Sequence, residues 1–180
     1  MEKLPIFLSL EGKKVLVVGG GRAALIKIKT LLETGASFDV IAKEFSEQTE
    51  QILIKNGIDY QKKEIEQKDL EGMFVVFAAA EKNINDIVAN WVKEKNILCC
   101  KADGRGDFIV PYHKRKKKLT VAISTDGLFP LVGRKLCETI DLSIGDKLEY
   151  LGQKRETIIE EIEDEQQRKR ALEQLLEEYL

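Results

Sequence analysis

The chain has 180 residues, of which 43% are hydrophobic and 33% charged, the composition of a globular protein with a charged surface. Its 29 basic and 31 acidic side chains give a net charge of −2, which argues against a nucleic-acid partner. One histidine, three cysteines and no Cys-x-x-Cys pair exclude a zinc site built from the usual ligands. The number of cysteines is odd and two of them, Cys99 and Cys100, are adjacent, so we expect reduced thiols and a cytoplasmic protein. The uncharged apolar run at 74–80 is far too short for a membrane span, and no membrane partner is expected.

The first hundred residues alternate between apolar runs typical of strands and segments with helical periodicity. Strands are expected at 15–18, 38–42, 58–60, 73–79 and 97–100. Helices are expected at 23–34, 46–55 and 84–95, and the first two are followed by a glycine. Strands that alternate with helices form parallel sheets, so the sequence predicts an α/β fold with a doubly wound, Rossmann-type sheet.

The pattern changes in the second half. Strand-like runs at 108–111 and 119–124 flank a basic run, Lys114 to Lys118. A helix is expected at 131–139. The remaining chain carries apolar stripes at three- and four-residue spacing on both sides of a polar stretch, 163–170, where we expect a turn or an exposed helix end.

A glycine-rich turn joins the first predicted strand to the first predicted helix. Gly19, Gly21 and Ala24 fit the pattern G-x-G-x-x-[G/A]. In that pattern the glycines allow a tight turn and the close approach of a pyrophosphate to the backbone, and the helix N–H groups face the phosphates. We therefore favour dinucleotide binding over a glycine turn without a ligand. The predicted cofactor residues are Gly19, Gly20, Gly21, Arg22, Ala23, Ala24, Lys43, Ala79 and Ala80.

The residue that usually separates NAD from NADP is missing. The second predicted strand ends at Ala42 and Lys43, where many NAD-binding folds have an acid for the ribose hydroxyls. Glu44 follows slightly too late along the chain. Lys43 or Arg22 could meet a 2′-phosphate, or both could be solvated surface bases. Spacing alone leaves NAD and NADP open.

Several segments carry a family resemblance. They are residues 5–8 and 12–24 with Lys27, Asn85 after Phe77-Ala78-Ala79, Asp107 to Pro111, and Ala122 to Gly127 with Pro130. Together they resemble the precorrin-2 dehydrogenase and sirohydrochlorin ferrochelatase family, which also forms the N-terminal part of the multifunctional sirohaem synthase. The resemblance covers about residues 2–142. The Asp-Phe-Ile-x-Pro and Ile-Ser-Thr-x-Gly-x-x-Pro segments are its most specific parts.

The resemblance implies three parts and a reaction. The parts are an NAD-binding Rossmann domain at 1–112, a small dimerisation segment at 113–145 and a short helical C-terminal domain at 146–180. The implied reaction is the NAD-dependent oxidation of precorrin-2 to sirohydrochlorin for sirohaem biosynthesis. Some members also insert ferrous iron in the same pocket. The implied partners are a tetrapyrrole substrate and a second copy of the chain in a homodimer.

The resemblance also assigns site residues. The family's catalytic aspartate corresponds to Asp103, a pocket serine to Ser124 and a pocket histidine of some members to His113. Asp103 would take a proton while the nicotinamide takes a hydride, and it could hold iron transiently without forming a permanent metal site. The residues by themselves allow simpler interpretations, since aspartate and serine also form turns and a histidine beside lysines is often a surface residue.

The implied substrate is a polyanionic ring, which gives the basic residues a second interpretation. Lys114 to Lys118, Arg105, Arg134 and Lys135 could steer and hold it, although Lys114 to Lys118 could equally be a solvated hairpin turn. The chain departs from the family pattern in a shorter loop between Asp103 and Asp107, and at Ala80, Asp126 and Cys137. These departures bear on iron insertion more than on the dehydrogenase reaction.

Two other function classes share part of the pattern. A nucleotide-sensing regulatory module has the same glycine turn, but it normally keeps the acid after the second strand. A tetrapyrrole-binding protein without turnover would keep the binding segments and lack the reaction. Incubation with precorrin-2 and NAD separates these classes from the enzyme.

Overall fold

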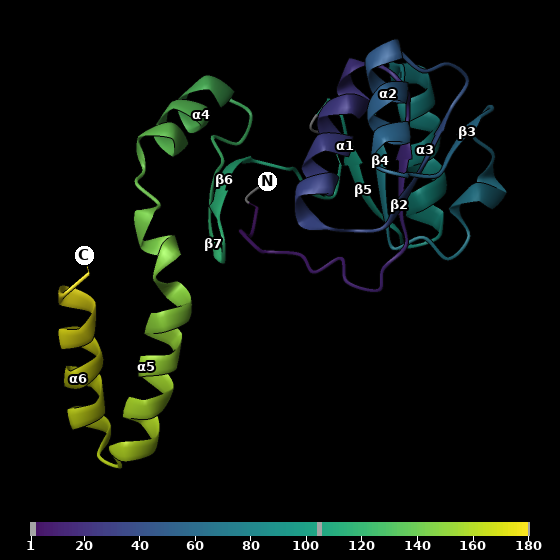
Figure 1. Ribbon diagram of the computed structural model, residues 1–180. Helices are drawn as coiled ribbons and strands as arrows, with labels where there is room; N and C mark the ends of the chain where they lie inside the picture. The colour runs from purple at the N-terminus through teal and green to yellow at the C-terminus, as the bar shows by residue number, and fades with distance from the viewer. Residues whose placement is uncertain (1–2, 104–105, 180) are drawn as a thin grey trace. The chain divides into compact units, whose positions relative to one another are not determined.

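The computed structural model describes residues 3–103 and 106–179. The chain forms two compact units, of which the first ends at Val110 and the second begins at Pro111 (Figure 1). The domain boundaries expected at residues 113 and 146 stay predictions.

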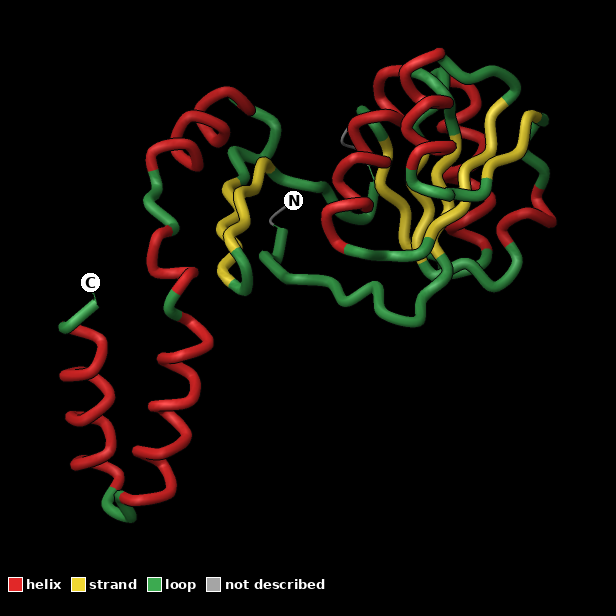
Figure 2. The backbone as a smooth tube through the Cα atoms, viewed as in Figure 1, coloured by secondary structure: helices red, strands yellow, loops and turns green. Residues whose placement is uncertain are grey.

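The first unit is a five-stranded parallel sheet in the order β3-β2-β1-β4-β5. Its strands are β1 (Val15–Val18), β2 (Phe38–Ala42), β3 (Tyr60–Lys62), β4 (Val75–Ala78) and β5 (Leu98–Lys101). The helices are α1 (Arg22–Thr34), α2 (Glu47–Lys55), the 3-10 helix η1 (Gln67–Leu70) and α3 (Lys82–Glu94). Figure 2 shows the strands as one sheet with helices around it. The predicted Rossmann fold is confirmed.

Two hydrophobic cores, one on each face, hold this sheet between its helices. Successive strand residues point to opposite faces, so Val15 and Val17 join one core while Leu16 and Val18 join the other. The first core includes residues of α1 and α2, and the second includes residues of α3. Burial on both faces explains why the central strands are apolar throughout rather than alternating.

The helix ends follow from individual residues. Gly35 ends α1 in the left-handed conformation, with φ of 72°, as the sequence predicts for a glycine after the last helical residue. Ser46 caps α2, since its side chain accepts a hydrogen bond from the Thr49 N–H. These local stops fix the lengths of the loops that enter and leave the sheet.

The second unit begins with an antiparallel hairpin and continues as helices. The hairpin consists of β6 (Tyr112–Lys116) and β7 (Leu119–Ile123). It is followed by α4 (Pro130–Thr139), the 3-10 helix η2 (Ser143–Asp146), α5 (Leu148–Glu161) and α6 (Glu165–Glu177). Helix α4 packs on the hairpin through the buried residues Gly133 and Cys137. A Cβ at Gly133 would lie 3.1 Å from the Ile123 carbonyl oxygen, so the small residue permits this close packing.

Several predicted boundaries were wrong. The strand expected at 108–111 does not form, because Asp107 bonds to the backbone of β5 and the hairpin begins only at Tyr112. The basic run is not a turn as a whole, since Lys114 to Lys116 belong to β6. The weak strand expected at 58–60 lies at Tyr60–Lys62. The polar stretch 163–170 was expected to be a turn or an exposed helix end, and this prediction is confirmed, because a short non-helical connection is followed by the exposed start of α6.

No helix in residues 3–103 and 106–179 is long and apolar enough to cross a membrane.

The three cysteine thiols provide a test of the packing. Cys99, Cys100 and Cys137 are free and buried. Burial, followed by the charge of Asp107, raises the pKa of Cys99 from its usual 9.0 to about 11. We expect alkylation at mildly alkaline pH to be slow in the native protein and fast in guanidinium chloride, as measured by mass spectrometry. The pKa of Cys99 is higher in the folded than in the unfolded protein. Its contribution to the free energy of unfolding should therefore be fully present below pH 9 and should be lost as the pH rises toward 11. Rapid native alkylation of Cys99 would contradict this packing.

Candidate active site

The glycine turn brings the ends of three strands into direct backbone contact. Gly19 follows β1 with φ of +131°, and a Cβ there would lie 2.4 Å from the Ala79 carbonyl oxygen. A Cβ on Gly20 would lie 2.1 Å from the Glu44 carbonyl oxygen. The Gly19 N–H donates to the Ile41 carbonyl at 2.9 Å. Glycines are therefore required at both positions by the protein's own backbone, before any ligand is considered.

Gly21 has the opposite surroundings. A Cβ built on it meets no atom within 4 Å, and the residue is exposed at the N-terminus of α1. The first turn of α1 contains no acidic residue, and its first N–H groups lack an intrahelical acceptor. An open glycine beside free helical N–H groups is a cradle for a phosphate group. The predicted residues Gly21 to Ala24 thus fit a dinucleotide pyrophosphate.

The loop after β4 is fixed by a buried amide. Asn85, which is 4% exposed, accepts a hydrogen bond from the Ala80 N–H at 2.8 Å and donates to the Ala80 carbonyl at 2.9 Å. The Ala79 N–H donates to the Val18 carbonyl. The predicted cofactor residues Ala79 and Ala80 therefore lie beside the glycine turn. The sequence contained Asn85 in a family segment but indicated no role for it, and its only local signal is an amide on the apolar face of α3.

Lys43 follows β2 at the position that contacts the cofactor's ribose in Rossmann folds. Its Nζ lies 2.5 Å from Oε1 of Glu64, and both side chains are exposed. The hydrogen bond to Glu64 raises the pKa of Lys43, and the charges of Glu81 and Glu44 act in the same direction. Sequence reasoning considered Lys43 and Glu44 but missed Glu64, which lies beyond β3.

Asp103 lies just after β5 in an ion-pair group. Lys101 Nζ lies 3.5 Å from Asp103 Oδ2 and 2.5 Å from Asp86 Oδ1 of α3. The Lys101 side chain is only 9% exposed. The hydrogen bond to Asp86 raises the pKa of Lys101, and the charges of Asp103 and Asp86 add to this while desolvation opposes it. Lys101, which the sequence did not single out, therefore holds the two carboxylates at the carboxyl edge of the sheet.

The family segment that starts at Asp107 closes the outer edge of β5. Asp107 Oδ2 accepts the Cys99 N–H at 2.8 Å, and the Asp107 N–H donates to the Cys99 carbonyl at 2.8 Å. A Cβ on Gly106 would lie 2.2 Å from that carbonyl oxygen. Phe108 packs edge-on against Phe77, with ring centroids 5.8 Å apart. These contacts fix the chain on the far side of the loop that carries Asp103.

His113 and Ser124 lie in the second unit, at the open end of the hairpin. His113 pairs with Ala122 across the strands, and its Nδ1 is 3.2 Å from the Pro111 carbonyl oxygen. Ser124 directly follows β7, and its Oγ accepts the Asp126 N–H at 3.0 Å. The hairpin therefore brings together two of the three predicted catalytic residues, whereas the third, Asp103, belongs to the first unit. Their assignment to the reaction stays a prediction.

The predicted substrate-holding bases make contacts within the second unit. Lys114 Nζ donates to the Ile140 carbonyl at 2.9 Å, and Arg115 Nε donates to the Lys117 carbonyl. Lys116 pairs with Asp146 at 2.5 Å. Other ion pairs join Lys117 to Asp146, and Arg134 and Lys135 to Glu138. Arg105 lies outside the described residues. The basic run thus joins the hairpin to η2 and to the end of α4.

Across residues 3–103 and 106–179, histidine, cysteine and acidic side chains form no group of three or more that could hold a metal ion.

A parallel doubly wound sheet with an open phosphate cradle after its central strand defines a Rossmann unit that binds a nicotinamide dinucleotide. Residues 6–112 match the family described as "Putative NAD(P)-binding". The solved structure of SirC, precorrin-2 dehydrogenase, has a TM-score of 0.77 to this chain at 25% identity, covering 96% of this chain and 89% of that chain.

Proteins of similar sequence are also precorrin-2 dehydrogenases or siroheme synthases. A precorrin-2 dehydrogenase of Bacillus subtilis (strain 168) is 29% identical over 140 residues, 77% of this chain and 86% of that protein. A precorrin-2 dehydrogenase of Priestia megaterium is 30% identical over 75% of this chain and 68% of its own length. Siroheme synthase 3 of Aeromonas hydrophila subsp. hydrophila is 31% identical, and the chain spans 39% of its length. The chain belongs to the precorrin-2 dehydrogenase family.

The open position at Gly21 gives a direct test of the cradle. Gly21→Ala should fold normally, because φ is −92° and the new methyl meets no protein atom. The methyl would occupy the space that a pyrophosphate needs, so we expect NADH affinity to fall about tenfold or more. Calorimetry measures the NADH affinity, and thermal melting shows whether the variant folds normally.

Two further variants control this experiment. Gly152→Ala, also in open space but within α5, should raise the melting temperature slightly, because alanine favours a helix more than glycine does, and should leave NADH affinity unchanged. Gly19→Ala should lose stability as well, because its methyl would collide with the Ala79 carbonyl. Unchanged NADH binding by Gly21→Ala would refute the assignment of the cradle.

Proposed function

We propose that this chain catalyses the NAD-dependent oxidation of precorrin-2 to sirohydrochlorin. The observation that carries the proposal is the position of Asp103 at the same edge of the sheet as the glycine turn. Strands β1, β4 and β5 are parallel neighbours, and the register pairs Val18 with Ala78 and Ala78 with Lys101. Ligands of open α/β sheets bind outside the carboxyl ends of the strands. The family membership supports the choice of substrate.

Asp103 is the proposed general base. Oxidation at a saturated carbon of the macrocycle requires the loss of a hydride and of a proton. When bound, the nicotinamide supplies the hydride acceptor. Asp103 accepts the proton, and Lys101 positions its carboxylate from the floor of the site. His113 and Ser124 are proposed to donate hydrogen bonds to the polyanionic ring.

NAD is proposed as the cofactor rather than NADP. Three carboxylates, those of Glu64, Glu81 and Glu44, act on the ammonium of Lys43 at the ribose position. A 2′-phosphate would bring two further negative charges into this acidic surface, whereas ribose hydroxyls would not. Buried free thiols support a reducing compartment, for which we propose the cytoplasm.

Replacement of Asp103 tests the proposed reaction. Asp103→Asn removes the proton acceptor while it keeps the size of the side chain. We expect kcat for the formation of sirohydrochlorin to fall by about a hundredfold or more, with NADH affinity unchanged. Absorbance of the product and calorimetry with NADH measure the two quantities.

The matched control is Asp59→Asn, an exposed aspartate before β3 at the opposite edge of the sheet, which should retain full activity. Full activity of Asp103→Asn would remove Asp103 from the mechanism. Tetrapyrrole binding without NAD-dependent turnover by the unaltered protein would favour a binding protein, and NADH binding without tetrapyrrole binding would favour a regulatory module. Ferrous iron added to the same assay tests iron insertion, which stays a prediction.

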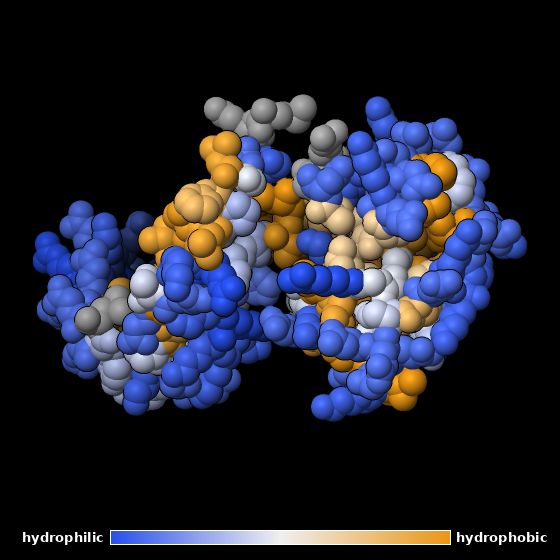
Figure 3. Space-filling model, turned by 90° about the horizontal axis from the view of Figure 1, so that it is seen from above, coloured by the Kyte–Doolittle hydropathy of each residue, from blue (hydrophilic) through white to orange (hydrophobic). Residues whose placement is uncertain are grey.

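A homodimer is proposed because α4 and the loop before it expose a continuous set of large apolar side chains. Exposure runs from 39% for Val132 to 92% for Leu128, and the set also contains Phe129, Leu131 and Leu136. Figure 3 shows hydrophobic side chains gathered over the unit that carries α4. Apolar patches of this kind usually lie at protein interfaces. The resemblance to a dimeric family supports a second copy as the partner.

The double variant Leu131→Lys, Leu136→Lys should shift the protein from dimer to monomer in sedimentation velocity, because two charges would be buried without partners. Ile26→Lys, at an exposed apolar residue of α1, is the matched control and should leave the mass unchanged. A dimeric double variant would show that this patch is not the interface.

A further inference from the structure

The residue that follows β2 is in an unusual position for an NAD site. Rossmann folds contact the ribose there, with an acid for the hydroxyls of NAD or a base for the 2′-phosphate of NADP. In this chain the residue is Lys43, which by itself would favour a 2′-phosphate. Its ammonium is instead paired with Glu64, at an Nζ to Oε1 distance of 2.5 Å. The pairing neutralises the charge of Lys43. Because the carboxylates of Glu44 and Glu81 also act on this ammonium, the position as a whole is acidic.

The pairing of β2 with β3 brings the backbone of Glu64 close to that of Lys43. The two strands are parallel, and Ala42 lies opposite Lys62 in the register. The Lys63 N–H then donates to the Ala42 carbonyl at 2.9 Å, which continues the pairing beyond the last strand residues. Continuing the register sets Lys43 opposite Lys63, and Glu64 is the residue after Lys63. The strand register therefore brings Glu64 within one residue of the position opposite Lys43, and the side chains complete the contact.

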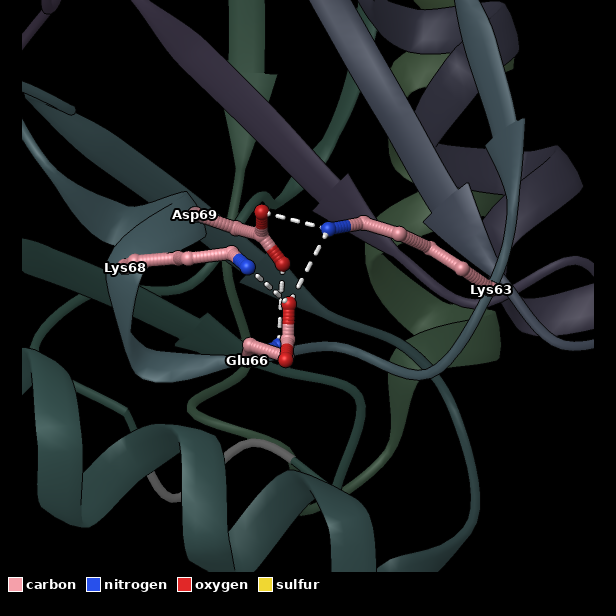
Figure 4. Close-up of polar contacts among 4 residues, drawn as sticks. All are labelled: Lys63, Glu66, Lys68 and Asp69. Atoms are coloured by element: carbon pink, nitrogen blue, oxygen red, sulfur yellow. Dashed lines mark hydrogen bonds and ion pairs between the residues drawn. The ribbon is translucent and has the colours of Figure 1, made fainter.

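A second set of contacts anchors the segment that follows Glu64. Lys63 Nζ lies 2.6 Å from Asp69 Oδ1, and the other carboxylate oxygen of Asp69 accepts the Glu66 N–H at 2.9 Å (Figure 4). Glu66 in turn pairs with Lys68 at 2.8 Å. The Asp69 side chain is 12% exposed, and Leu70 is fully buried. This cluster, Lys63-Glu66-Lys68-Asp69, fixes the backbone on the C-terminal side of Glu64.

The exposure of the pair means that it contributes little to the free energy of unfolding. The Lys43 and Glu64 side chains are 66% and 73% exposed, and exposed ion pairs contribute little to folding. A charged ligand arriving at this surface would nevertheless meet both charges. The pair is therefore placed to act on an approaching charged ligand more than on folding.

We propose that Glu64 is the specificity-determining residue that makes this site select NAD over NADP. Glu64 neutralises Lys43 and adds a carboxylate beside the ribose position, so a 2′-phosphate is repelled. The proposal deepens the proposed use of NAD and rests on it, but it does not depend on the oxidation of precorrin-2.

Cofactor binding tests the proposal without any turnover. We would measure dissociation constants for NADH and NADPH by cofactor fluorescence in the unaltered protein and in Glu64→Gln. The unaltered protein should prefer NADH. Glu64→Gln should bind NADPH about tenfold more tightly with NADH affinity within about twofold, because Lys43 becomes available to the 2′-phosphate. The NADPH gain should shrink at high salt, since the groups are exposed.

Two variants make the result specific. Lys43→Met added to Glu64→Gln should abolish the gain in NADPH affinity, because the lysine is the group that becomes available. Glu71→Gln removes the same charge from the loop before β4, at the opposite edge of the sheet, and should change neither affinity.

The contradicting outcomes are distinct. An unchanged NADPH to NADH ratio in Glu64→Gln, a gain that persists without Lys43, or a preference of the unaltered protein for NADPH would each overturn the role of Glu64. Binding of neither cofactor would overturn it together with the cradle. Absence of precorrin-2 oxidation, with the expected cofactor ratios, would overturn only the proposed reaction.

Discussion

The close backbone contact at the end of β1 is the constraint on which the rest of the site depends. Gly19 and Gly20 lie so near the carbonyl groups of Ala79 and Glu44 that no side chain fits at either position. Because the strand ends meet directly, α1 begins at the central strand with Gly21 open and its first N–H groups unobstructed. The same contact places the loops after β2 and β4 beside the cradle. The geometry that a cofactor would use is thus a consequence of how the sheet itself packs.

Two ion-paired groups at the carboxyl edge of the sheet use charge differently. At β5, Lys101 is almost buried and joins Asp86 to Asp103, so breaking the group would leave a buried charge without a partner. At β2, Lys43 and Glu64 are exposed, so their effect is felt by an approaching anion more than by the fold. Both groups depend on neighbours from other elements, namely α3 for Lys101 and the segment after β3 for Lys43.

The second unit uses its bases mainly for its own assembly. Lys114 and Lys116 tie the hairpin to Ile140 and Asp146, which are far along the chain. The lysine run could by itself be interpreted as an anion-binding surface. In the structure, its lysines also join the hairpin to η2 and to the end of α4. The apolar set on α4 and the loop before it is exposed in the described part of the chain, and it fits the proposed interface with a second copy.

The sequence by itself determined the parallel sheet, the glycine turn and the family, because apolar periodicity, glycine at obligatory close contacts and short specific motifs are local properties. It pointed to Lys43 and Asp103 but not to the groups that act on them. Asp86, Glu64 and Lys101 became visible only in the tertiary structure, since their partners come from other strands and helices. Asn85 lies in a family segment of the sequence, but its hydrogen bonds to Ala80 were seen only in the structure. The strand expected at 108–111 failed for the same reason: Asp107 bonds to the edge of β5, and a contact between two segments overrode a local preference.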